Sequence, residues 1–107
     1  MMIDPDAPSH ASPTFSPIRH WLVVNIAGAD LKAGKLGDAQ TLSPYHAPGP
    51  PTGTGYHRYG QFIFKQKTAQ TKFGPVPSSI AKWNYTGFID EYGLGEKVAS
   101  NYFLAEA

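Results

Sequence analysis

The chain contains no cysteine among its 107 residues. This absence excludes a disulfide scaffold, a thiol nucleophile and a thiolate metal site. It fits a reducing compartment, and the acidic, proline-broken start MMIDPDAPSH is unlike a secretory signal or a transit peptide. We therefore expect a cytoplasmic protein.

An excess of one charge and long apolar runs are also missing. Nine basic residues stand against eight acidic ones, which gives a formal net charge of +1. Without a basic surface field to displace counterions from a polyanion, nucleic acid is not expected as a partner. The longest apolar run, Trp21–Val24, is far too short to span a bilayer, so membrane contact is expected to be peripheral at most.

Hydrophobic residues make up 41% of the chain and aromatic residues 13%, which is enough for one small domain with a single core. Eleven glycines and ten prolines predict short elements joined by many loops. The stretches 5–17 and 43–55 are rich in proline, and we expect both to be ordered surface loops because each adjoins strongly apolar sequence.

Three segments predict strands. His20–Ile26 is β-branched and almost continuously apolar, which predicts a strand covered on both faces. Tyr59–Lys65 and Val98–Leu104 contain the aromatic and β-branched residues that favour strands.

One segment, Phe88–Tyr92, predicts a short helix that Thr86 caps and that Gly93 or Gly95 ends. Lys82–Tyr85 fits either a short strand or the entry to this helix. The sum is a mainly β fold with one or two short helices.

Two aspartates lie in the motif Asp4-Pro5-Asp6-Ala7-Pro8. Each proline favours an extended conformation in the residue before it, and an extended stretch places both carboxylates on the same side. The alternative is an ordinary turn with solvated acids, since Asp-Pro is common turn chemistry.

His20 begins the most apolar strand. A period of two places its ring on the face of Leu22 and Val24, opposite Trp21 and Val23. A histidine at the lip of a buried strand could line a pocket, or it could be a satisfied core or edge residue.

The stretch 53–59, GTGYHRY, contains two glycines that could form an anion-binding nest of backbone amides. If His57 begins a strand, His57 and Tyr59 share one face and Arg58 takes the other. The alternative is a glycine turn that leads into a strand. Two histidines, a carboxylate and a tyrosine together could bind an anion, more tightly at lower pH. His10 and His46 are expected to be bystanders in loops.

The motifs DPDAPS, HWLVVNI and GPPTGTGYHRY, in that order, closely resemble the phosphatidylethanolamine-binding protein family. The resemblance extends to the tail segments FIDEYGLG and VASNYFLAE. The family includes Raf kinase inhibitor proteins, plant flowering regulators and carboxypeptidase Y inhibitors. It implies a central antiparallel-rich sheet, a smaller flanking sheet and a small anion pocket.

The resemblance also implies residue roles. Asp6 and Arg58 would support the pocket as an ion pair between its two loops, and no catalytic residue, metal or cofactor is expected. From this pair we expect Arg58→Ala to lower stability more than His57→Ala. The implied ligand-binding positions are Asp4, Ala7, Pro8, His20, Gly49, Pro50, His57 and Tyr59.

The sequence departs from the family pattern in three ways. Ile18 stands where many animal members have tryptophan, and Ala47 stands where they have glycine. The strands that precede DPDAP in the family and the helical tail of animal members have no counterpart here. Residues 1–107 are therefore expected to form one partial domain with a sheet edge and part of the core uncovered. A complementary chain that supplies the missing strands is one expected partner.

The leading hypothesis is a non-enzymatic binding module for phosphate-bearing head groups such as phosphoethanolamine, or for other small phosphate or carboxylate anions. Its surface would regulate a protein kinase or a protease. One alternative is a structural subunit or fragment of a larger assembly with a vestigial pocket. A weaker alternative is a metal-assisted hydrolase that uses Asp4, Asp6, His20 and His57, although histidine spacing typical of metal sites is absent.

Overall fold

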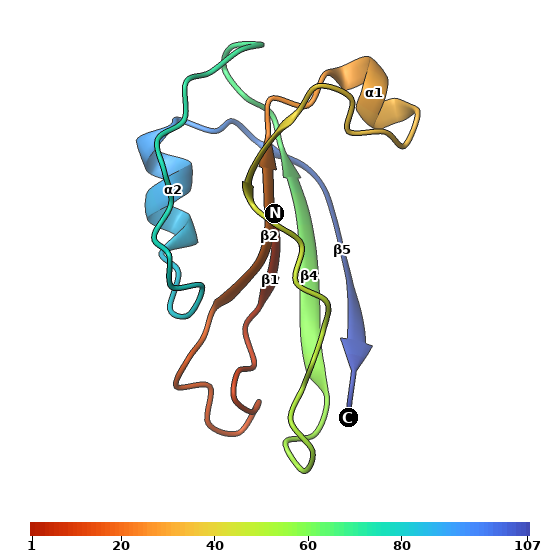
Figure 1. The fold of residues 1–107 in the computed structure, drawn as a ribbon, viewed down its shortest axis with the longest axis vertical. Coiled ribbons are helices and arrows are strands. Elements are labelled where there is room, and N and C mark those ends of the chain that lie inside the picture. The colour runs from red at the N-terminus through yellow and green to blue at the C-terminus, as the bar shows by residue number, and fades with distance from the viewer.

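The computed structural model describes all residues 1–107 and contains one five-stranded sheet in the order β3-β2-β1-β4-β5, in which every neighbouring pair is antiparallel (Figure 1). A mainly β fold with two short helices is thereby confirmed. All five strands belong to this one sheet, so these residues do not form the smaller flanking sheet. The elements are β1 (Met2–Asp4), β2 (Ile18–Val24), α1 (Gly28–Lys32), β3 (Gln40–Ser43), β4 (His57–Phe64), α2 (Tyr85–Glu91) and β5 (Lys97–Ala105).

The three predicted strands exist with shifted ends. β2 stops at Val24 because Asn25 adopts a left-handed backbone with φ of 57°, which no strand continues. β4 begins at His57, two residues before the predicted start, and β5 extends the last strand at both ends. β1, β3 and α1 were not predicted from the sequence.

Helix α2 confirms the predicted helix but corrects its cap. The side chain of Asn84 accepts a hydrogen bond from the backbone N–H of Gly87 at 3.0 Å, so Asn84 is the N-cap. Thr86 instead donates its hydroxyl to the Asn84 side chain at 3.0 Å. Residues 82–85 are therefore the entry to the helix, and Gly93, with φ of 53°, ends it.

The core lies between one face of the sheet and α2 (Figure 1). Phe88 of α2 stacks on Phe73 with ring centroids 5.8 Å apart and contacts Trp83 at 5.5 Å. The expectation that both faces of the His20–Ile26 segment are covered is wrong, because Trp21 and Val23 are only half-buried. The buried cluster consists of Ile3, Leu22, Val24, Phe73, Trp83 and Phe88.

The two proline-rich stretches form no helix or strand, as predicted, except that Ser43 ends β3. The cis peptide bonds are Ala7–Pro8 and Ser16–Pro17, both in the first stretch, and the Gly49–Pro50–Pro51 segment has none. Neither helix is long or apolar enough to cross a membrane.

Candidate functional site

A β-bulge in β2 turns His20 away from the core. β1 pairs Met2 with Trp21 but Ile3 with Arg19, so His20 is an extra residue in the ladder. Leu22 packs with Ile3 in the core cluster, whereas the His20 ring lies edge-on to Tyr59 at 5.1 Å. Tyr59 occupies the sheet face opposite Phe62, which packs against that cluster. The prediction that His20 shares the face of Leu22 and Val24 is therefore wrong.

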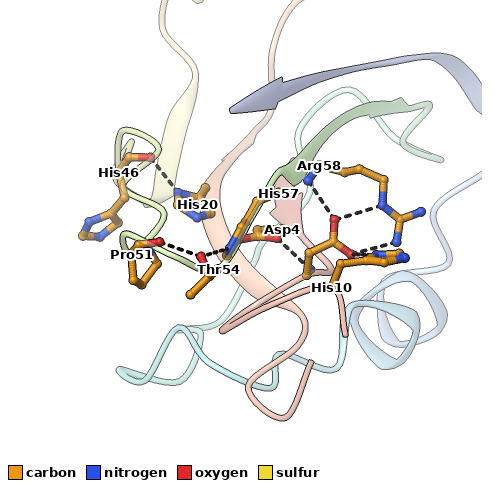
Figure 2. A network of polar contacts seen from close by, with 9 residues as sticks. Asp4, His10, His20, His46, Pro51, Thr54, His57 and Arg58 are labelled. Atoms are coloured by element: carbon orange, nitrogen blue, oxygen red, sulfur yellow. Dashed lines mark hydrogen bonds and ion pairs between the residues drawn. The ribbon is translucent and has the colours of Figure 1, made fainter. Parts of the chain in front are cut away.

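A buried chain of polar contacts begins at Asp4, the last residue of β1 (Figure 2). One carboxylate oxygen accepts the Asp6 backbone N–H at 2.7 Å, and the other lies 2.9 Å from Nδ1 of His57. Nε2 of His57 lies 2.9 Å from the hydroxyl of Thr54, which lies 2.7 Å from the Pro51 carbonyl. The Asp4 and His57 side chains are almost completely buried.

Two glycines with positive φ, Gly53 at 84° and Gly55 at 78°, place Thr54 in this chain. The Thr54 N–H donates to the Pro51 carbonyl, so the loop uses that amide internally and not for an anion nest. The Thr54 hydroxyl has one proton, and the Pro51 carbonyl can only accept it. The Thr54 oxygen then faces Nε2 of His57 as an acceptor, as the Asp4 carboxylate faces Nδ1.

A second ionic cluster holds the Asp4–Asp6 turn against β4. The buried Asp6 carboxylate accepts bonds from the Arg58 side chain at 2.8 and 3.0 Å and from the Arg58 backbone N–H at 2.8 Å. His10 Nδ1 lies 2.9 Å from the same carboxylate. The Arg58 bonds hold the pKa of Asp6 well below its usual range, against the effect of its burial, and Asp6 raises the pKa of Arg58.

This cluster confirms the Asp6–Arg58 pair that the family resemblance implies. The expectation that His10 is a bystander in a loop is wrong, because His10 contacts Asp6 directly. The signal was present in the sequence, since His10 follows Asp6 by four residues. Thr54 was likewise missed as a partner of His57, although it lies three residues upstream between the two glycines.

The Tyr59 ring contacts both His20 and His57. Its ring stacks with His57 at 6.4 Å and with Phe103 of β5 at 5.3 Å. Burial, reinforced by the charges of Asp4 and Asp6, raises the pKa of Tyr59 to about 12. The phenol therefore keeps its proton at neutral pH, and its hydroxyl makes no hydrogen bond to the rest of the chain.

His20 is anchored from the loop between β3 and β4. Its Nδ1 lies 2.8 Å from the His46 carbonyl, and the His46 N–H donates to the His20 carbonyl at 2.8 Å. The loop is thus fixed on one side at His46 and on the other at Pro51 (Figure 2). Gly49 and Pro50 lie between these two anchors.

The other predicted wall residues lie in the turn after β1. Ala7 is buried and Pro8 is half-buried. The contacts described above thus join Asp4, His20, His57 and Tyr59 into one group, with Asp6 and Arg58 beside it. Gly49 and Pro50 lie in the loop between β3 and β4, and Ala7 and Pro8 lie in the turn after β1.

Two hollows of the molecule are not centred on this group. A hollow of about 480 Å³ lies on the Asp6–Arg58 side and reaches the group through Thr54. A larger apolar hollow lies at the other end of β1. No three histidine or acidic side chains are arranged to hold a metal ion.

The antiparallel sheet with a buried Asp–His pair at one end defines a small β protein with a polar site. The family model described as phosphatidylethanolamine-binding protein matches residues 1–103. The chain therefore belongs to the phosphatidylethanolamine-binding protein family.

Solved structures with similar folds agree with this assignment. A carboxypeptidase Y inhibitor, crystallised with its cognate proteinase, matches 99% of this chain with a TM-score of 0.80 and 27% identity. The solution structure of CG7054 matches 100% with a TM-score of 0.75 and 33% identity. A phosphatidylethanolamine-binding protein from Plasmodium vivax matches 98% with a TM-score of 0.72 and 26% identity.

The chain spans only part of the length of these relatives. It covers 57% of the carboxypeptidase Y inhibitor, 60% of CG7054 and 61% of the Plasmodium vivax protein. About two fifths of each relative therefore has no counterpart in these 107 residues.

Proposed function

We propose that the chain is a non-enzymatic binding module that takes a small phosphate-bearing group, such as phosphoethanolamine, at the site formed by Asp4, His20, His57 and Tyr59. The observation that supports this most is the buried contact chain from Asp4 through His57 to Thr54. It is a costly arrangement for a purely structural sheet, because it buries two ionisable groups.

The polar atoms of Tyr59 and His20 that have no partner within the chain favour an anion as the ligand. The Tyr59 phenol retains its proton and has no partner within the chain. Neutral His20 uses its ring proton on the His46 carbonyl, so its Nε2 donates to a ligand only when the ring is protonated. Anion binding should therefore take up a proton and strengthen as the pH falls.

The engagement of both aspartates favours binding over hydrolysis. The Asp4 carboxylate contacts His57 and the Asp6 N–H. The Asp6 carboxylate contacts Arg58 and His10. Neither carboxylate is left to act as a base toward a substrate without breaking a buried contact.

We further propose a protease as the protein partner of the assembled domain. The support is the similarity to a carboxypeptidase Y inhibitor crystallised with its cognate proteinase. The kinase partner and the cytoplasmic location stay predictions from the sequence.

The test of the anion site is a calorimetric and NMR titration with phosphoethanolamine and, separately, inorganic phosphate. We expect saturable binding with amide shifts at residues 53–59 and 4–7. His57→Gln and Asp4→Asn should each weaken binding at least tenfold. His46→Ala is the matched control, because His46 contributes only backbone atoms and its removal deletes an imidazole outside the group.

Equal affinity in the wild type, His57→Gln and Asp4→Asn would overturn the site. Tighter binding of phosphoethanolamine than of phosphate would identify a head group as the ligand. No binding of either compound, together with a partner chain that co-purifies at fixed stoichiometry, would favour a structural subunit.

A further inference from the structure

Arg19 is a buried arginine whose charge has no counter-ion. It lies in β2 opposite Ile3, and its guanidinium carbon lies 5.4 Å from the ring centroid of the core residue Trp83. Only 2% of Arg19 is exposed. Its Nη2 donates to the Pro77 carbonyl at 2.6 Å, whereas Nε and Nη1 are buried without a partner. Because a buried, unpaired cation is costly, this guanidinium is suited to receive an anion.

No acidic side chain neutralises Arg19. The ion pairs of the chain involve His10, His57 and Arg58, and none of them includes Arg19. Burial lowers the pKa of Arg19, and no carboxylate opposes that effect. Residues 39–89, which include the loop above Arg19, contain no aspartate or glutamate. An anion at Arg19 therefore requires a bound group or a modified side chain.

The loop above Arg19 consists of residues 77–80, which we call the strap, and it is tied to Arg19 at both ends. Its first carbonyl accepts the bond from the Arg19 side chain, and its last carbonyl accepts the Arg19 backbone N–H at 2.9 Å. The two middle residues, Ser78 and Ser79, are exposed. Neither their backbone N–H groups nor their hydroxyls make a hydrogen bond within the chain. The strap thus holds two unengaged serines beside a buried cation.

Covalent geometry places Ser78 close to the guanidinium. The Ser78 Cα and the Pro77 carbonyl oxygen belong to one trans peptide unit, in which these two atoms are about 2.8 Å apart. Together with the 2.6 Å bond to that oxygen, this keeps the Ser78 Cα within about 5.4 Å of Nη2. A phosphate on the Ser78 hydroxyl can span this distance and offers three acceptor oxygens to the unpartnered Nε and Nη1.

We propose that Ser78 is a phosphorylation site and that its phosphate pairs with Arg19. A protein kinase would transfer the terminal phosphoryl group of a nucleoside triphosphate to the Ser78 oxygen, with release of the nucleoside diphosphate and of the hydroxyl proton. The exposed bend at Ser78 lies in a stretch without helix or strand between β4 and α2, where such an enzyme can reach it. The new ion pair neutralises a buried charge and fastens the strap to β2. This site is separate from the anion site and does not depend on it.

The first experiment installs phosphoserine at position 78 of the 107-residue chain. The matched control carries phosphoserine at Ser12, which is also exposed and lies in the loop between β1 and β2. Phosphorus NMR measures the second pKa of each phosphate, which is ordinarily about 6. We expect a value at least tenfold more acidic at position 78 than at position 12, because the guanidinium stabilises the dianion. The Arg19 Nε–H resonance should shift on phosphorylation at 78 and not at 12.

The second experiment removes the charge of Arg19. Arg19→Gln keeps a donor for the Pro77 carbonyl but has no charge to pair with a phosphate. Phosphorylation of Ser78 should raise Tm by several degrees in the wild type and should not raise it in Arg19→Gln. The phosphorus measurement needs no substitution at Arg19, so it decides the question even where Arg19→Gln does not fold.

The third experiment examines the protein purified from its own cells with phosphatases inhibited. Cleavage after Lys72 and Lys82 releases the peptide 73–82, which contains both serines of the strap. Fragmentation in a mass spectrometer should locate a phosphate on Ser78.

Three outcomes would overturn the proposal. They are equal pKa values of the phosphates at 78 and 12, the same change in Tm with and without the charge of Arg19, and the absence of phosphate from the peptide 73–82. A saturable shift of the Arg19 Nε–H resonance by inorganic phosphate in the Ser78→Ala chain would assign the site to a free anion instead.

Discussion

Replacing Arg58 by alanine tests whether the Asp6–Arg58 pair fastens the turn after β1 to β4. The change removes two side-chain bonds to a carboxylate that is only 2% exposed, while the Arg58 N–H and His10 remain as partners. Bonds to charged groups contribute about 1.5–3 kcal/mol each. Because the Arg58 side chain is 49% exposed, water already weakens these two bonds. We therefore expect Arg58→Ala to lower the free energy of unfolding by about 2 kcal/mol in total.

Urea denaturation followed by tryptophan fluorescence measures this loss, which should lower Tm by about 10 °C. Arg58→Lys keeps the charge but not the paired bonds, so its free energy of unfolding should fall less than that of Arg58→Ala. The pH dependence provides a second check, because the pKa of Asp6 is lowered in the folded state. Such a group stabilises the fold fully above its ordinary value and loses that effect as the pH falls toward the folded value.

The gap between wild type and Arg58→Ala should therefore be constant from about pH 7 to pH 5 and should narrow below about pH 4. Equal urea midpoints at pH 7, or a gap that persists undiminished at pH 2, would refute the reasoning.

Two further predictions concern a helix cap and the amino terminus. Asn84→Ala should destabilise the chain by about 1 kcal/mol, because the Gly87 N–H loses its acceptor. Thr86→Ala should destabilise it less. Equal losses of stability in thermal unfolding would contradict the assignment of Asn84 as the cap. Acetylation of Met1 should raise stability by about 3 kcal/mol at pH 5 and by little at pH 9, because the buried amine has a pKa lowered to about 6 and its charge opposes folding only at low pH. Unfolding of the acetylated and free chains at both pH values measures this difference, and a gain that does not depend on pH would show that the charge is not its source.

Burial changes one expectation drawn from the sequence. Arg58→Ala was expected to cost more stability than His57→Ala. His57 proves to be 2% exposed, with contacts to Asp4, Thr54 and Tyr59, while Arg58 lies at the surface. Truncating His57 leaves a cavity and a buried Asp4 carboxylate whose remaining partner is the Asp6 N–H, so we now expect it to be the more damaging change. The anion titration uses His57→Gln for this reason.

Local patterns predicted the elements whose residues repeat with a clear period. The β-branched run of β2, the aromatic residues of β4 and the motif at residues 57–59 gave the strands and the side chains that share a face with Tyr59. The helix around Phe88 followed from its bounding polar and glycine residues, although two candidate caps stood close together. These features depend on neighbours in the sequence.

The features that the sequence did not reveal depend on distant pairing. The bulge at His20 arises because β2 pairs with Met2 and Ile3, and no period within β2 indicates it. β1 and β3 have only three and four residues and exist as strands through their partners. The widths of the gaps in a sheet likewise follow only once the strand order is known.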